Sequence, residues 1–192
     1  MLALTLGLVF FILPHMLREL HFREKIKLQL INERTYNGLF SAVCLLGIVL
    51  MIWGKSTARF YMVWEPPFDQ RYLAYLLMIP ACILTVAGFI PNSYIRWQVR
   101  NPLLTGSALW AMAHLWTNGD LSSILLFGTF AIWTLMKLIT LRHQSVQSKP
   151  ELNWLRRDLT AVICGLAIYL AIYICHGYLF GVGPCDTVKD NF

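Results

Sequence analysis

The sequence predicts an all-α integral membrane protein, folded as a bundle of about six transmembrane helices, and two observations carry this prediction. Hydrophobic residues make up 57% of the 192 positions and charged residues only 14%, and the mean hydropathy is +0.57. One water-soluble core cannot bury that much apolar surface. Long apolar runs also recur along the chain with short charged loops between them. We therefore expect the lipid bilayer as a partner and no nucleic acid, because the positive charges flank apolar runs.

Six segments are candidates for the helices, namely 2–17, 36–53, 72–90, 103–117, 121–138 and 159–180. A helix needs about 20 residues to cross a hydrocarbon core of about 30 Å, so the shorter segments require snorkelling flanks or local thinning of the bilayer. No long linker, low-complexity tract or internal repeat interrupts the series. We expect residues 1–192 to form a single domain.

Lysines and arginines predict the orientation, because loops rich in these residues stay on the cytoplasmic side. Twelve of the sixteen lie in or beside the first, third and fifth loops. The opposite side carries only four, Lys55, Arg59, Arg71 and Lys189. Both termini are therefore predicted to lie outside.

Local signals mark the ends of individual helices. Pro102 suits the first turn of the fourth helix, where a missing backbone N–H costs nothing. Asn118, Gly119 and Asp120 predict a tight outer turn, with Asp120 capping the next helix. Pro80 lies inside the third segment and is expected to kink it.

Intramembrane polar groups are few. Five cysteines show no CxxC spacing, so neither a disulfide framework nor a zinc site is indicated. The absence of a mid-membrane carboxylate argues against a carboxylate-based ion transporter. The candidates that remain are three histidines, His15, His114 and His176.

A histidine in lipid must pair, face a cavity or bind a ligand, and imidazole is a standard axial ligand of haem iron. His114 ends a stripe of small residues with Ser107 and Ala111, and such a stripe lets a helix or a flat ring approach closely. His176 ends a similar stripe with Tyr169 and Tyr173. Hydrogen bonding between helices is the better explanation of any one of these histidines taken alone, but three of them in one small bundle without a mid-membrane carboxylate make metal ligation about as good an explanation. At 1.5 Å per residue, His114 lies about 18 Å and His176 about 25 Å from the inner ends of their helices, whereas His15 lies near the inner third of its own.

Four separated motifs resemble the NnrU family of bacterial multi-pass membrane proteins. They are the segment 101–120, the pair Pro14-His15, the opening 34–41 of the second helix and the stretch 176–182. The resemblance implies the bacterial inner membrane and an association with nitrite and nitric oxide reduction, with nitrite or nitric oxide reductase components as partners. More distantly the chain is similar to 15-cis-zeta-carotene isomerase, a haem b membrane enzyme.

Similarity to the isomerase implies that His15 and His114 ligate haem b, with His176 as the alternative ligand that helix depth favours. The cysteine of the isomerase one turn before the second histidine is Ala111 here, and its Arg-His-Pro is Arg100-Asn101-Pro102. Both differences weaken the case for a carotenoid reaction in this protein. An Arg-His-Pro opening also occurs in membrane methyltransferases, which need a later pair of adjacent acidic residues. No such pair follows Arg100-Asn101-Pro102 before the C-terminal tail, and this disfavours a methyltransferase.

Three hypotheses remain: a haem b protein supporting nitrogen-oxide respiration, a haem-dependent isomerase of isoprenoids or carotenoids, and a cofactor-free assembly subunit. No residue is assigned a catalytic role.

Overall fold

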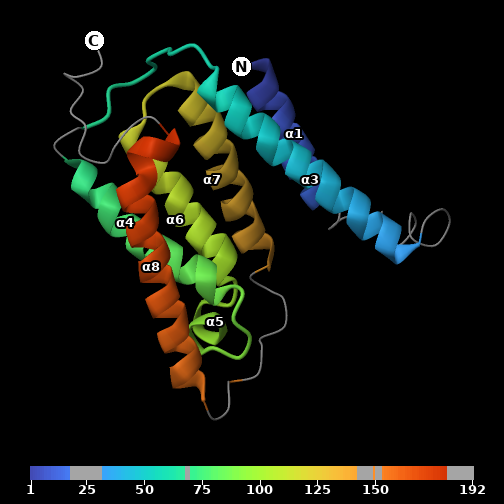
Figure 1. Ribbon diagram of the computed structural model, residues 1–192, viewed down its shortest axis with the longest axis vertical. Helices are drawn as coiled ribbons and strands as arrows, with labels where there is room; N and C mark the ends of the chain where they lie inside the picture. Colours follow the sequence, from blue (N-terminus) through green and yellow to red (C-terminus); the bar gives the residue numbers. More distant parts are fainter. Residues whose placement is uncertain (18–31, 68–69, 142–148, 150–152, 181–192) are drawn as a thin grey trace. The chain divides into compact units, whose positions relative to one another are not determined.

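The computed structural model describes residues 1–17, 32–67, 70–141, 149 and 153–180, and within these ranges it contains helices but no strand (Figure 1). The all-α prediction is therefore confirmed. A helix occurs at each of the six predicted segments, and one further short helix is present. In chain order the helices are α1 (Leu2–Leu17), α3 (Glu33–Ser56), α4 (Arg71–Ala87), α5 (Tyr94–Val99), α6 (Pro102–Thr117), α7 (Leu121–Leu141) and α8 (Trp154–Phe180).

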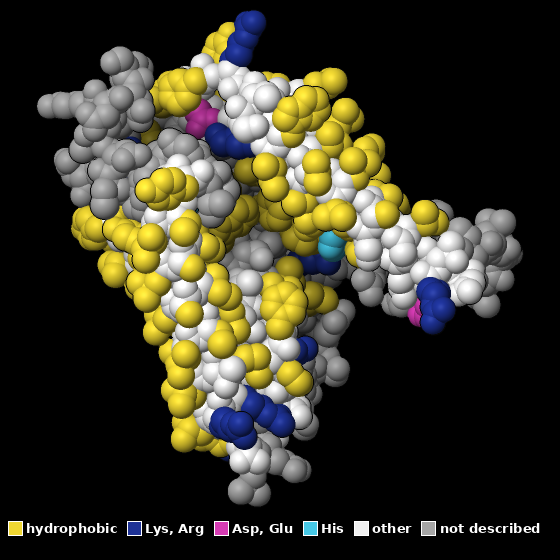
Figure 2. Space-filling model, viewed as in Figure 1, with side chains coloured by type: hydrophobic (Ala, Val, Ile, Leu, Met, Phe, Trp, Pro, Cys, Tyr) yellow, Lys and Arg dark blue, Asp and Glu magenta, His cyan; other side chains and the backbone are white. Residues whose placement is uncertain are grey.

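Three of these helices, α3, α7 and α8, are long and apolar enough to cross a membrane, while α1 and α4 are apolar but shorter. Large hydrophobic side chains cover much of the exposed surface (Figure 2), including Leu45, Val49 and Ile52 on α3 and Leu155, Ile163 and Ile174 on α8. Such extensive exposed apolar area is what lipid, and not water, would cover. The chain is thus a helical membrane protein, and six crossings with outside termini stay predictions.

The described residues divide into two compact units, and each is considered by itself. The first comprises Met1–Glu65 with Gly119–Thr129, and the second comprises the described parts of Pro66–Asn118 and Phe130–Phe192. Helix α7 begins in the first unit and ends in the second.

Glycines bring α1 and α3 together in the first unit. A Cβ placed on Gly7 would lie 2.7 Å from the carbonyl oxygen of Gly47, and one on Gly54 would clash with the backbone of Leu4. Because early residues of α1 meet late residues of α3, the two helices are antiparallel. Without a side chain at these positions the backbones can approach closely, which is how helices associate in lipid.

The loop after α3 is held against the start of α7. The backbone N–H of Val63 donates to the carbonyl of Gly119 at 2.8 Å, and the N–H of Leu121 donates to the carbonyl of Tyr61 at 2.8 Å. These bonds satisfy backbone groups at the turn that precedes α7.

Helix α4 packs against both α6 and α8 in the second unit. A Cβ on Gly106 of α6 would lie 2.7 Å from the carbonyl oxygen of Ala81, and one on Gly165 of α8 would lie 2.6 Å from the Cα of Ile83. Small residues thus set the spacing of these helices as well.

Helix α5 lies in a segment that was expected to be loop. Ser93 accepts a hydrogen bond from the backbone N–H of Arg96 at 3.0 Å and so caps the helix. The N–H of Ile95 donates to the Asp158 carboxylate at 3.3 Å, and the rings of Tyr94 and Trp154 lie 5.3 Å apart. Contacts with α8 therefore stabilise a six-residue helix that is too short to show a periodic pattern.

Candidate functional site

Two of the three candidate histidines are neighbours in the second unit. His114 lies in the last turn of α6 and His176 lies near the end of α8. Their ring centroids are 6.5 Å apart, with an angle of 31° between the ring planes. Both side chains are partly buried. The two imidazoles therefore face a common region between two helices.

A backbone hydrogen bond orients the ring of His114. Its Nδ1 lies 2.9 Å from the carbonyl oxygen of Trp110, one turn earlier. Because a carbonyl oxygen only accepts, Nδ1 must carry the proton, and a neutral imidazole then keeps its lone pair on Nε2. This is the arrangement in which a histidine binds a metal through Nε2 while the other nitrogen holds the ring in place.

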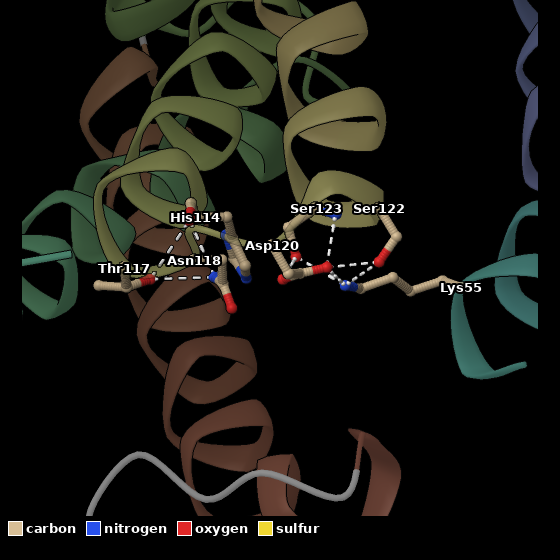
Figure 3. Close-up of polar contacts among 7 residues, drawn as sticks. All are labelled: Lys55, His114, Thr117, Asn118, Asp120, Ser122 and Ser123. Carbon is tan, nitrogen blue, oxygen red and sulfur yellow. Dashed lines mark hydrogen bonds and ion pairs between the residues drawn. The ribbon is translucent and has the colours of Figure 1, made fainter. Parts of the chain in front are cut away.

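The end of α6 is fixed by the polar residues that follow His114. The carbonyl of His114 accepts hydrogen bonds from the backbone N–H of Asn118 at 2.9 Å and from its side-chain amide at 2.8 Å (Figure 3). Thr117 also donates its hydroxyl to the carbonyl of Ala113 at 3.2 Å. These bonds satisfy carbonyls that a helix end otherwise leaves without a partner, so the turn carrying His114 is well anchored.

Aromatic rings lie near the histidines on α6 and on α8. The ring of Trp110 lies 5.3 Å from that of His114 and 5.5 Å from that of Phe130. Along the predicted stripe on α8, the rings of Tyr169 and Tyr173 lie 6.0 Å apart. Aromatic side chains are therefore the described neighbours of His114, and aromatic rings also precede His176 on its own helix.

The small-residue stripe on α6 serves helix packing. Ala111 is fully buried, and the hydroxyl of Ser107 donates to the carbonyl of Leu103 in its own helix at 2.9 Å. Ala111 is therefore used in packing, and the hydroxyl of Ser107 is paired within its own helix.

His15 lies in the first unit, and a similar bond orients its ring. Its Nδ1 lies 2.7 Å from the carbonyl oxygen of Phe11. The rings of Phe11 and Phe40 lie 4.6 Å and 5.1 Å from the His15 ring, and the Sγ of Cys44 lies 3.7 Å from Nδ1. The contact with Cys44 joins α1 to α3, and the sequence did not indicate it.

A second polar cluster was also not predicted from the sequence. Lys55, at the end of α3, donates hydrogen bonds from Nζ to the carboxylate of Asp120 at 2.8 Å and to the hydroxyls of Ser122 and Ser123 at 2.8 Å and 2.6 Å (Figure 3). Asp120 also accepts hydrogen bonds from both serine hydroxyls and from the backbone N–H of Ser123 at 3.0 Å. The last of these bonds confirms that Asp120 caps α7.

Burial and hydrogen bonding act in opposite directions on the Asp120 carboxyl. Burial raises its pKa, while hydrogen bonds from Lys55, Ser122 and Ser123 lower it by more, so that it falls from 3.8 to about 2. Both serines are almost fully buried. The cluster is therefore a partly buried ionic network that ties α3 to α7.

Metal-ligating residues are sparse in the part of the chain that the structure describes. There, no group of three or more His, Cys, Asp or Glu side chains is placed to hold a metal ion, and the described cysteines form no disulfide. The neighbouring imidazoles of His114 and His176 remain as candidate ligands, and haem iron takes one or two protein ligands.

Comparison with known families agrees with the motifs described above. A family model described as NnrU protein matches residues 3–184, which is nearly the whole chain. No curated protein and no solved structure matches it. The length of the family match, over a helical and strongly apolar chain, shows that the protein belongs to the NnrU family.

Proposed function

We propose that this protein holds haem b between His114 and His176 and thereby serves nitrite or nitric oxide reduction in the bacterial inner membrane. The observation that carries the proposal is the approach of the two imidazoles, whose centroids lie 6.5 Å apart on α6 and α8. The link to nitrogen oxides rests on membership of the NnrU family.

The spacing of the pair would let both imidazoles hold one iron. An imidazole nitrogen lies about 2 Å from a metal that it binds and about 1 Å from its own ring centroid, so two rings that share a metal would have centroids no more than about 6 Å apart. The measured 6.5 Å is close to this value. The hydrogen bond from Nδ1 of His114 to Trp110 also leaves the lone pair on Nε2, the nitrogen that ligates.

The chain's own residues would bind and orient the group. Trp110 fixes the tautomer of His114 and packs beside it, and Asn118 anchors the last turn of α6. Haem bound by two histidines supplies one-electron transfer. We infer a role in passing electrons to a reductase, with no bond-making step assigned to a protein side chain.

The test is an absorbance spectrum of the detergent-purified protein from haem-sufficient cells, oxidised and dithionite-reduced. We expect a Soret band and a sharp reduced α-band in the wild type, both lost in His114→Ala and in His176→Ala. His15→Ala is the matched control and should keep both bands. Adding imidazole to His176→Ala should restore the α-band, because free imidazole can occupy the vacated position.

Each result discriminates between hypotheses. Loss of the bands in His15→Ala and His114→Ala, with His176→Ala unchanged, would replace our ligand pair with the one that the resemblance to the isomerase implies. A colourless, stable wild-type protein would overturn the haem proposal and leave the assembly-subunit hypothesis, with the histidines bonded between helices.

A further inference from the structure

The uncharged part of α3 marks a membrane boundary at the end of that helix. No charged residue occurs between Arg34 and Lys55, a stretch of about 20 residues that extends about 30 Å as a helix, the thickness of a hydrocarbon core. Lys55 bonds to Asp120, which directly precedes α7, another helix long and apolar enough to cross a membrane. The end of α3 and the start of α7 therefore lie at the same boundary, whichever side of the membrane that is.

The segment that follows α3 at this boundary is apolar and extended. Residues 60–63 read Phe-Tyr-Met-Val, and the charged residues Arg59 and Glu65 lie on either side of them. Met62 pairs with Asp120 in an isolated antiparallel bridge, and two backbone hydrogen bonds of 2.8 Å hold residues 61 and 63 beside the turn before α7. The position of the segment is therefore fixed against the ends of two membrane-length helices.

All four side chains of this segment are exposed, although all four are large and hydrophobic. Their exposed fractions lie between 49% for Met62 and 66% for Phe60. Successive side chains of an extended chain point to opposite faces, so a wet segment of this kind usually buries every second one. A run of four exposed apolar residues is unfavourable in water and is typical of an interaction surface.

We propose that residues 60–63 form an interfacial segment, which inserts its side chains into lipid at the level of the headgroups. Phe60 and Tyr61 add aromatic rings at a boundary where tyrosine rings are favoured. The exposed side chains of Ile52 and Trp53 continue the apolar surface of α3 up to this segment. Lipid is therefore the occupant that is continuous with the apolar surface of the helix.

The backbone limits how deep the interfacial segment lies. Backbone N–H and C=O groups outside a helix find no partners in the hydrocarbon core, so an extended chain stays near the headgroups, where water reaches it. Side chains at this level reach about 5–10 Å into the boundary between headgroups and acyl chains. A strand from a second protein copy is the competing occupant, because the segment is already extended.

The first test measures what surrounds the segment in liposomes. The full-length protein, with its five cysteines replaced by serine, carries one nitroxide label on Phe60→Cys, Met62→Cys or the reference variants Ile52→Cys and Glu65→Cys. Collisions with O2, which concentrates in lipid, are compared with collisions with a nickel chelate that stays in water. We expect the ratio of O2 to nickel collisions at positions 60 and 62 to approach that at position 52 and to exceed that at position 65 by about threefold or more.

Each other outcome of this measurement overturns the proposal. Frequent nickel collisions at positions 60 and 62, as at position 65, would place the segment in water. Slow collisions with both reagents would show that protein covers it, as strand pairing with a second copy requires.

The second test uses the unmodified protein in liposomes, so it does not depend on the folding of cysteine-free variants. Hydroxyl radicals generated in water oxidise methionine, and Met62 is 49% exposed, so contact with water would slow its oxidation only about twofold relative to the unfolded chain. Cover by lipid should slow it about tenfold or more, because the hydrocarbon region holds almost no water. Phe60→Glu/Val63→Glu should restore oxidation to within about twofold of the unfolded chain, since carboxylates are costly in lipid. A twofold effect in the wild type, or no change in the double variant, would overturn the proposal.

Discussion

Replacing Asp120 with alanine tests whether the ionic network at the start of α7 stabilises the fold. The change removes the partner of Lys55, the acceptor of two serine hydroxyls and the cap of α7. Ser122 and Ser123 would still accept hydrogen bonds from Lys55, so the ammonium would not be stranded. The loss in free energy of unfolding is therefore smaller than for a fully buried ion pair.

The magnitude follows from the contacts. Loss of an N-cap costs about 1 kcal/mol. The ion pair lies between the surface and buried cases, because the side chains of Lys55 and Asp120 are 34% and 10% exposed. Surface pairs contribute up to about 1 kcal/mol and breaking a buried pair costs about 3–5 kcal/mol, so we take about 2 kcal/mol. The sum of about 3 kcal/mol corresponds to a fall of about 6–12 °C in melting temperature for a chain of this size.

The assay is thermal unfolding in detergent, followed by circular dichroism. Glu65→Ala is the control, since Glu65 is an exposed carboxylate in the same unit. A melting temperature for Asp120→Ala within about 1 °C of that control would refute the reasoning. The double variant Lys55→Met/Asp120→Ala should also lose less free energy of unfolding than the sum of the two single variants, because each single variant already breaks the same ion pair.

Two further predictions concern pH and helix packing. The carboxyl of Asp120 has a pKa depressed to about 2 in the folded protein, so its contribution to stability is complete above about pH 4 and is lost as pH falls towards 2. The difference in melting temperature between the wild type and Asp120→Asn should therefore narrow over that pH range. A difference that stays constant would contradict the prediction. Gly47→Ala places a Cβ 2.9 Å from the carbonyl oxygen of Gly7 and should destabilise by about 1–3 kcal/mol. Gly38→Ala on the same helix meets no atom within 4 Å and should be neutral or stabilising by up to about 1 kcal/mol, so equal effects of the two changes would show that α1 and α3 do not pack as described.

The positions of the six predicted helices could be read from the sequence because each of these helices is encoded locally. An apolar run defines α1 over Leu2–Leu17, as expected, and Pro102 with the Asn118 stop bounds α6. The cap of α7 could also be predicted, since Asp120 contacts a backbone N–H only three residues later. In every case the signal and the structure it specifies lie within one or two turns.

The network at Lys55 could not be predicted because its partners are distant in sequence. A lysine at the end of an apolar run is equally compatible with a side chain that snorkels to the interface. Asp120 lies 65 residues further along the chain, and no local sequence pattern indicates that it pairs with Lys55. Helix α5 could not be predicted for a related reason, because its contacts with α8 stabilise it more than its own six residues do.

The histidines also combine a local contact, which the sequence can predict, with a distant contact, which it cannot. His15 and His114 each have Nδ1 next to the carbonyl oxygen four residues earlier, a bond that any helical histidine can form and that by itself specifies no ligand. What distinguishes them is the group across the helix interface. His114 has a second imidazole at 6.5 Å, whereas His15 has the thiol of Cys44 and the ring of Phe40. Two facing imidazoles suit one iron, and a single imidazole packed among a thiol and phenyl rings suits a packed helix pair, so the haem proposal rests on His114 with His176.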